Sequence, residues 1–229
     1  MISVTYISKD RPNHLKRSVK SLFSQTVKPE HIVITDCSDD KASIENVIDE
    51  LKKESQIPIT FIWKPKEELS RSQGRNLGRE YVKTPIAVST ESDILFPQTI
   101  IEETLKVFGN PPQKRYVQTY ISLEEENGTE KRYNWCGNAP NCNCGFFQVY
   151  RVEDFDNIGG YNPFFKGWGY EDYDFSQRMI SLGCSHVIVP LYVMHMWHPS
   201  TSYLKENNHD QNKAISQKIR WDNIKKTWA

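Results

Sequence analysis

The chain has 229 residues, the length of one sizeable domain, which is long enough to bury a core without disulfide staples. Its 29 Lys and Arg residues balance its 29 Asp and Glu residues, so the formal net charge is zero. A neutral chain argues against a broad basic surface for nucleic acid, and it removes the simplest attraction to an anionic membrane.

The first residues predict a short strand rather than a basic segment followed by an apolar stretch, and no run of about 20 apolar residues predicts a membrane-spanning helix. Five cysteines are an odd number, so they cannot all pair, and a reducing compartment is favoured. Cys136, Cys142 and Cys144 lack the CxxC spacing of common zinc modules, so structural zinc is not favoured. We expect a cytoplasmic protein without an integral membrane segment, with peripheral contact at the inner membrane face left open.

The first half of the chain alternates strand-like and helix-like segments. Apolar runs that predict strands begin near Ile2, Ile32, Ile59, Ile86 and Val117. Their spacing of roughly 30 residues is typical of βαβ units. Helical stripes lie between them, at 15–23, 44–51 and 101–108. We therefore predict an α/β, Rossmann-like sheet whose nucleotide-binding half is 1–110, with ligands beyond the carboxyl ends of the strands.

The second half has a different pattern. Gly, Asn, Cys and aromatic residues crowd 133–170, which indicates loops that line a site. A helix through Phe175, Met179 and Leu182, a strand over 186–196 and a last helix over 211–227 follow. No linker separates the halves, so we expect one domain over 1–229, with 111–229 as its second half.

Polar clusters follow three of the predicted strands. They are Ser8-Lys9-Asp10-Arg11, Asp36-Cys37-Ser38-Asp39-Asp40 and Glu91-Ser92-Asp93. Because parallel strands end at one edge of the sheet, these clusters together favour a nucleotide site. Glu91 and Asp93 are two residues apart on an extended chain, so both carboxylates project to one side, as the oxygen ligands of a divalent cation do. A solvated acidic pair at a strand end is the alternative interpretation.

Two further motifs lie late in the chain. The string GWGYEDYDF, residues 167–175, places two glycines around Trp168 and two acids at a helix start, where carboxylates favour the helix dipole. An ordinary helix start explains the acids but leaves the Gly-Trp-Gly unexplained. His195 and His198 follow the last predicted strand, where either imidazole could complete a metal site that suits Mn²⁺ better than Mg²⁺ alone.

These segments in this order resemble the GT-A glycosyltransferases, specifically family two and the β-galactosyltransferase and chondroitin-polymerase groups, over about residues 2–198. The segment IVITDCSDD is similar to the family's strand that ends in DDGS, SRSQGRNLG to its ARN segment, ESD to its DxD, and GWGYEDYDF to its GWGxEDxD. The chain departs from the family where Glu91 replaces the first Asp of DxD, and where Thr35 and Cys37 replace the first Asp and the Gly of DDGS.

The resemblance implies a GT-A fold, with a mixed, mostly parallel sheet flanked by helices, and it implies roles for the motif residues. Asp172 would be the catalytic base, and Trp168 and Glu171 would contact the sugar and the acceptor. The half 111–229 would then be the one that binds the donor sugar and the acceptor. Asp93 with His195, or with His198 as the alternative, would bind Mn²⁺ or Mg²⁺. The residues implied for the donor and its nucleotide are Ser8, Lys9, Arg11, Asp36, Arg71, Arg75, Glu91, Ser92 and Gly145.

The activity implied is metal-dependent transfer of a sugar from a UDP-sugar to a glycan acceptor, with inversion, as in polysaccharide biosynthesis. The donor sugar would be of the galactose, N-acetylgalactosamine or glucose type, and the small Cys142 is a hint of room for an N-acetyl group. The loop at Trp168 and the polar segment 199–210 are the candidate lids.

Three alternatives stay open at this point. A non-catalytic glycan-binding domain would use the aromatic residues without needing Glu91, Asp93 and His195 together. A sugar nucleotidyltransferase would need a glycine-rich phosphate loop after the first strand, and Ser8-Lys9-Asp10-Arg11 has no glycine. A retaining transferase on the same fold would be favoured by Asn rather than Asp at position 172.

Overall fold

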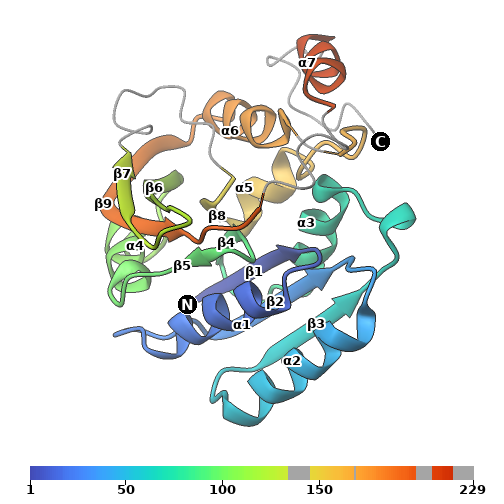
Figure 1. The fold of residues 1–229 in the computed structure, drawn as a ribbon. Coiled ribbons are helices and arrows are strands. Elements are labelled where there is room, and N and C mark those ends of the chain that lie inside the picture. Colours follow the sequence, from blue (N-terminus) through green and yellow to red (C-terminus); the bar gives the residue numbers. More distant parts are fainter. Residues whose placement is uncertain (134–144, 168, 200–207, 219–229) are drawn as a thin grey trace.

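The computed structural model describes residues 1–133, 145–167, 169–199 and 208–218, which form a mixed sheet with helices on both faces (Figure 1). The sheet has nine strands in the order β3-β2-β1-β4-β8-β6-β9-β5, and β7 pairs with β6 outside this path. The pairs β3-β2, β2-β1, β1-β4 and β6-β9 are parallel, and the other pairs are antiparallel. The predicted α/β sheet is confirmed, and β4 and β8 join the two halves of the chain into one sheet.

The structure contains the strands β1 (Ile2–Ser8), β2 (His31–Asp36), β3 (Ile59–Trp63), β4 (Ile86–Glu91), β5 (Ile94–Leu95), β6 (Arg115–Glu124), β7 (Glu130–Tyr133), β8 (Phe147–Arg151) and β9 (Ser185–His195). It contains the helices α1 (Pro12–Phe23), α2 (Lys41–Glu54), α3 (Arg71–Glu80), α4 (Ile100–Phe108), α5 (Val152–Asn157), α6 (Glu171–Ser181) and α7 (His209–Lys218), and a short 3₁₀ turn, η1 (Lys66–Glu68).

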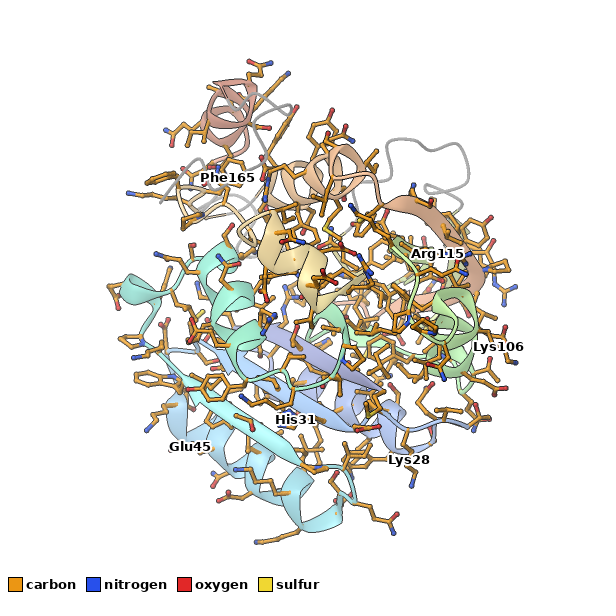
Figure 2. All side chains as sticks on the ribbon, turned by 180° about the vertical axis from the view of Figure 1, so that it is seen from behind. Lys28, His31, Glu45, Lys106, Arg115 and Phe165 are labelled. Atoms are coloured by element: carbon orange, nitrogen blue, oxygen red, sulfur yellow. The ribbon has the colours of Figure 1, made fainter. Side chains whose placement is uncertain are left out.

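Alternate residues of each strand pack on opposite faces of the sheet. Ile32 and Ile34 point into the core cluster that contains the apolar stripes of α1, α2 and α4. Val33, between them, points into the second cluster, which holds Phe155 of α5 and Phe175 of α6. Figure 2, seen from behind, brings α3 and α5 in front of the strands. Burial on both faces explains why these strands are continuous apolar runs.

The predicted helices at the start of the chain, at 44–51 and at 101–108 correspond to α1, α2 and α4, and the helix through Phe175 corresponds to α6. Helix α3 was not predicted from the sequence, although Ser70 and Gln73 form a complete capping box at its start. The short strands β5, β7 and β8 were not predicted either. Cys136, Cys142, Cys144, Trp168 and most of 199–210 lie outside the described residues, so the expectations for them stay predictions.

None of the helices within the described ranges combines the length and the apolar character needed to cross a lipid bilayer.

Candidate active site

The carboxyl ends of three parallel strands meet at one edge of the sheet. In the register of β1 with its neighbours, Ser8 lies opposite Asp36 of β2, and Ile7 lies opposite Glu91 of β4. Lys9 and Asp10 follow directly in a bend, where Asp10 adopts a left-handed backbone with φ of 52°. The three polar clusters that the sequence places after strands are therefore neighbours in space.

Asp36 is fully buried at this edge, and its carboxylate is used within the protein. Its Oδ1 accepts a hydrogen bond from the Ser38 backbone N–H at 2.8 Å, and its Oδ2 accepts one from the Ser38 hydroxyl at 3.1 Å. Burial raises the pKa of the Asp36 carboxyl, and the hydrogen bonds from Ser38 oppose that rise. The Ser38 hydroxyl also accepts from the Asp10 backbone N–H at 2.6 Å. Asp36 thus shapes the loops after β1 and β2, and its implied contact with the donor nucleotide stays a prediction.

Two arginines one helical turn apart in α3 converge on Glu91. Arg71 Nη1 lies 3.2 Å and Arg75 Nη2 lies 3.1 Å from Glu91 Oε1. Residues four apart share a helix face, which is why both side chains reach the same carboxylate. The two arginines hold the pKa of Glu91 below its ordinary value, against the opposite effect of burial. Arg71 is about a third exposed and can meet a ligand, whereas the Arg75 side chain is 1% exposed.

The predicted acidic helix start is present at α6, which begins at Glu171. The residue before it, Tyr170, adopts a left-handed backbone with φ of 72°, which is uncommon for a residue with a side chain. Glu171 is buried and accepts a hydrogen bond from the Gly169 backbone N–H at 2.9 Å. Its carboxylate lies 3.9 Å from the Arg71 guanidinium. This bonding fixes the entry into the helix that carries Asp172.

Asp172 is a second acid that faces Arg75, with 3.6 Å between its Oδ1 and Arg75 Nη2. Burial, with the negative charge of Glu171 as the next cause, raises the pKa of Asp172 well above its ordinary value. A carboxylate with a raised pKa is a stronger base than a free one, which suits proton abstraction from a sugar hydroxyl. Gly145 lies against this carboxylate, and a Cβ atom built at position 145 would overlap it.

The predicted metal ligands come together because β5 pairs with β9. Ile94 lies opposite His195 in that pairing, and the Met196 backbone N–H donates to the Asp93 carbonyl at 2.8 Å. Asp93 Oδ2 is 3.7 Å from His195 Nε2 and 3.3 Å from His198 Nε2. One ligand atom from each of the three residues lies within 4.8 Å of the others.

The donor set of this cluster fits a divalent metal. Asp93 Oδ1 and His198 Nε2 are buried and have no hydrogen-bond partner among the described residues. Burial lowers the pKa of both His195 and His198, which favours the neutral imidazole that a metal needs. One carboxylate and two imidazoles suit Mn²⁺. Arg11 forms an ion pair with Asp93, and its Nη2 lies 3.2 Å from His198 Nδ1, so it borders the same cluster. Ser92, next to Asp93, is buried.

Comparisons with known proteins show which solved structures share this fold. A family model described as the N-terminal domain of galactosyltransferase matches residues 131–200, a segment that contains 167–175. The solved structure of GalNAc-T7 with UDP, GalNAc and Mn²⁺ is 16% identical and superposes with a TM-score of 0.77 over 98% of this chain and 48% of its own. This chain has the GT-A glycosyltransferase fold.

Other solved structures with the GT-A fold agree. S. aureus TarS 1-349 is 12% identical, with a TM-score of 0.66 over 85% of this chain and 60% of its own. The mannosyltransferase PcManGT from Pyrobaculum calidifontis, in complex with GDP-Man and Mn²⁺, is 11% identical. Its TM-score is 0.66 over 89% of this chain and 59% of its own. The chain thus spans about half of the length of the structures it matches. A search of curated protein sequences finds no match.

The GT-A sheet brings together most of the residues that the sequence singled out. Asp93, His195 and His198 form one cluster, and Glu91, Arg71, Arg75, Glu171 and Asp172 form another. The burial of Arg75 between two acids was not predicted from the sequence. Nor was the buried hydrogen-bond network beside α6, in which Gln148 Nε2 donates to the Tyr116 hydroxyl at 2.8 Å. The capping box of α3 is the sequence signal that could have placed Arg71 and Arg75 on one helix face.

Proposed function

We propose that this chain is a metal-dependent, inverting glycosyltransferase that moves a sugar from a UDP-sugar to a glycan acceptor. The observation that carries the proposal is the presence of two side-chain clusters on one GT-A sheet. The cluster of Asp93, His195 and His198 offers ligands for a divalent cation. The second cluster offers Asp172, a half-buried carboxylate whose pKa is raised, as a base.

Asp93, His195 and His198 would hold Mn²⁺, which supplies positive charge to the diphosphate leaving group when bound. Arg71 and Arg11 are partly exposed cations: Arg71 contacts Glu91, and Arg11 contacts Asp93. They are therefore suited to bind the remaining phosphate charge. Asp172 would accept the proton of the acceptor hydroxyl as that oxygen attacks the anomeric carbon. General-base assistance of this kind is worth about two to four orders of magnitude in rate.

The name of the matched family model and the UDP and Mn²⁺ in the GalNAc-T7 structure support a UDP-sugar of the galactose or N-acetylgalactosamine type. The glucose type stays open as a donor. The GDP-Man in the mannosyltransferase structure makes GDP-sugars the alternative donor class. One displacement with a single base inverts the anomeric centre, whereas a retaining transferase would keep its configuration.

The test is a panel of UDP-galactose, UDP-N-acetylgalactosamine, UDP-glucose and GDP-mannose, measured by calorimetry with Mn²⁺ and with EDTA. We expect one UDP-sugar to bind only with Mn²⁺ and to be hydrolysed slowly when no acceptor is present. Binding without hydrolysis or transfer would favour a non-catalytic glycan-binding domain. NMR of the product anomer decides between inversion and retention.

A further inference from the structure

The guanidinium of Arg75 is buried between the nucleotide half and the α6 helix. Its Nη1 donates to the Ser89 hydroxyl at 2.8 Å, and its Nη2 donates to Glu91 Oε1 at 3.1 Å and to the Gly145 carbonyl at 3.3 Å. Its face lies over the ring of Tyr161, 5.3 Å from the ring centre. With its side chain 1% exposed, Arg75 is directed into the protein rather than toward a ligand.

The backbone and the side chain of Asp172 are held in different ways. Its carbonyl accepts a hydrogen bond from the Ser176 hydroxyl at 2.8 Å and lies 3.4 Å from Gln148 Nε2, which anchors the start of α6 to β8. Its carboxylate Oδ1 is buried and has no hydrogen-bond partner within the described part of the chain. Arg75 Nη2, at 3.6 Å, is the cation that faces this oxygen.

Several charged groups face the Asp172 carboxylate from the elements packed around it. Glu171 of α6 and Glu91 of β4 repel it, and Arg75 and Arg71 of α3 attract it. Tyr161 is also close enough to interact with both Asp172 and Arg75. Removal of Arg75 would therefore leave the carboxylate among two acids, with Arg71 as the more distant cation, and would make its ionisation less favourable.

We propose that Arg75 is a positioning residue that holds the carboxylate of Asp172 in place and supplies its counter-charge, and that it makes no direct contact with the donor nucleotide. The proposal rests on the proposed role of Asp172 as the base. It differs from the donor contact that the family resemblance implies for Arg75.

The test compares Arg75→Gln and Arg75→Lys with a control, Arg79→Gln. Arg79 lies one turn further along α3 and pairs with the exposed Asp156 at the surface. Two quantities are measured for each variant. One is the titration of the Asp172 carboxyl by ¹³C NMR, with the spectrum of Asp172→Asn to assign the signal. The other is the pH profile of kcat, together with the dissociation constant of the donor.

For Arg75→Gln we expect the Asp172 titration and the acid limb of kcat to move to higher pH by about one unit or more, as loss of an adjacent cation predicts. We also expect kcat at the optimum to fall by about 100-fold, as for a misplaced catalytic group. The donor dissociation constant should stay within about threefold of wild type. Arg75→Lys keeps the positive charge but lacks the planar guanidinium group. It should therefore show a smaller shift of the Asp172 titration than Arg75→Gln. Arg79→Gln should match wild type.

An Asp172 titration that is unchanged in Arg75→Gln would overturn the proposal, and so would a loss confined to donor affinity. If Arg75→Gln does not fold, Arg75→Lys decides by kcat and donor affinity: a lower kcat with an unchanged donor dissociation constant supports the proposal, and a loss confined to donor affinity overturns it. A wild-type protein that transfers no sugar from any donor would overturn the proposed function instead. The NMR titration would still show separately whether Arg75 controls the ionisation of Asp172.

Discussion

The carboxylate of Asp172 lies against the Cα atom of Gly145, in a space that any other residue at position 145 would fill with its Cβ. Gly145 is followed by the buried Phe146, which leads into β8, and Asp172 lies in the first turn of α6. The contact therefore joins two segments of the chain that the donor sugar and the acceptor are expected to share. It makes the absence of a side chain at 145 a requirement for the position of the Asp172 carboxylate.

We expect Gly145→Ala to lower both the stability of the protein and kcat, because the added methyl group must displace the Asp172 carboxylate. Overpacking of this kind costs about 1–3 kcal/mol. The same substitution should cost much less in an Asp172→Ala background, where the overlapped atoms are gone. A double-mutant cycle by urea unfolding measures this coupling. Additive effects of the two changes would show that Gly145 acts through another group.

We expect Asp172→Asn to abolish transfer while leaving the donor dissociation constant within about threefold, with kcat lower by about two to four orders of magnitude. In the wild type, kcat should fall as the pH drops through the raised pKa of Asp172, because only the ionised carboxylate accepts a proton. Turnover assays across pH and calorimetry with the donor check both statements. Equal losses of binding and turnover would contradict the role of Asp172 as a base.

The raised pKa of Asp172 also predicts how stability depends on pH. Between the ordinary pKa of an unfolded Asp and the raised pKa in the folded state, the native protein binds more protons than the unfolded chain. The contribution of this group to the free energy of unfolding therefore falls as the pH rises through that window. Asp172→Asn should thus gain stability relative to wild type as the pH rises through that window. Urea unfolding at each pH checks this, with Asp49→Asn, on the exposed side of α2, as the control.

We expect Asp93→Asn, His195→Gln and His198→Gln each to weaken Mn²⁺ binding by at least about tenfold, since even outer-shell changes typically cost about 10–100-fold. His186→Gln is the matched control. His186 lies at the other end of β9, where it stacks on Tyr116 and its Nε2 lies 3.0 Å from Gln118 Oε1. Calorimetric titration with Mn²⁺ and electron paramagnetic resonance of free Mn²⁺ measure the affinity. Unchanged Mn²⁺ affinity in His195→Gln or His198→Gln would remove that histidine from the site.

Asp174 and Arg178 form a buried ion pair that docks α6 onto the preceding loop. Arg178 Nη2 lies 2.6 Å from Asp174 Oδ2, and Nη1 donates to the carbonyls of Ile158 and Gly160 at 3.0 and 2.6 Å. We expect Arg178→Met to cost about 3–5 kcal/mol, because it leaves a buried carboxylate without its partner. Adding Asp174→Leu should recover part of that loss. Urea unfolding of the single and double variants measures both, and a double variant no more stable than Arg178→Met would contradict this account.

Local sequence patterns were enough to predict much of the fold. Apolar runs such as 32–34 and helical stripes such as 44–51 are local signals, because burial of a strand or of one helix face repeats over a few residues. The polar residues at the strand ends, Ser8, Asp36 and Glu91, could also be placed, since the carboxyl ends of parallel strands must share an edge. The two acids at the start of α6 follow from the same kind of local rule.

Only the tertiary structure decided which of these residues touch. The two-residue strand β5 is too short to give a sequence signal, yet its pairing with β9 is what carries Asp93 to His195 and His198, about 100 residues later in the chain. The burial of Arg75 and the close approach of Gly145 to Asp172 also depend on how α3, β8 and α6 pack together. Sequence periodicity records whether a residue faces a core. It carries no record of which distant residue will lie opposite, because that is decided by long-range packing between separate elements.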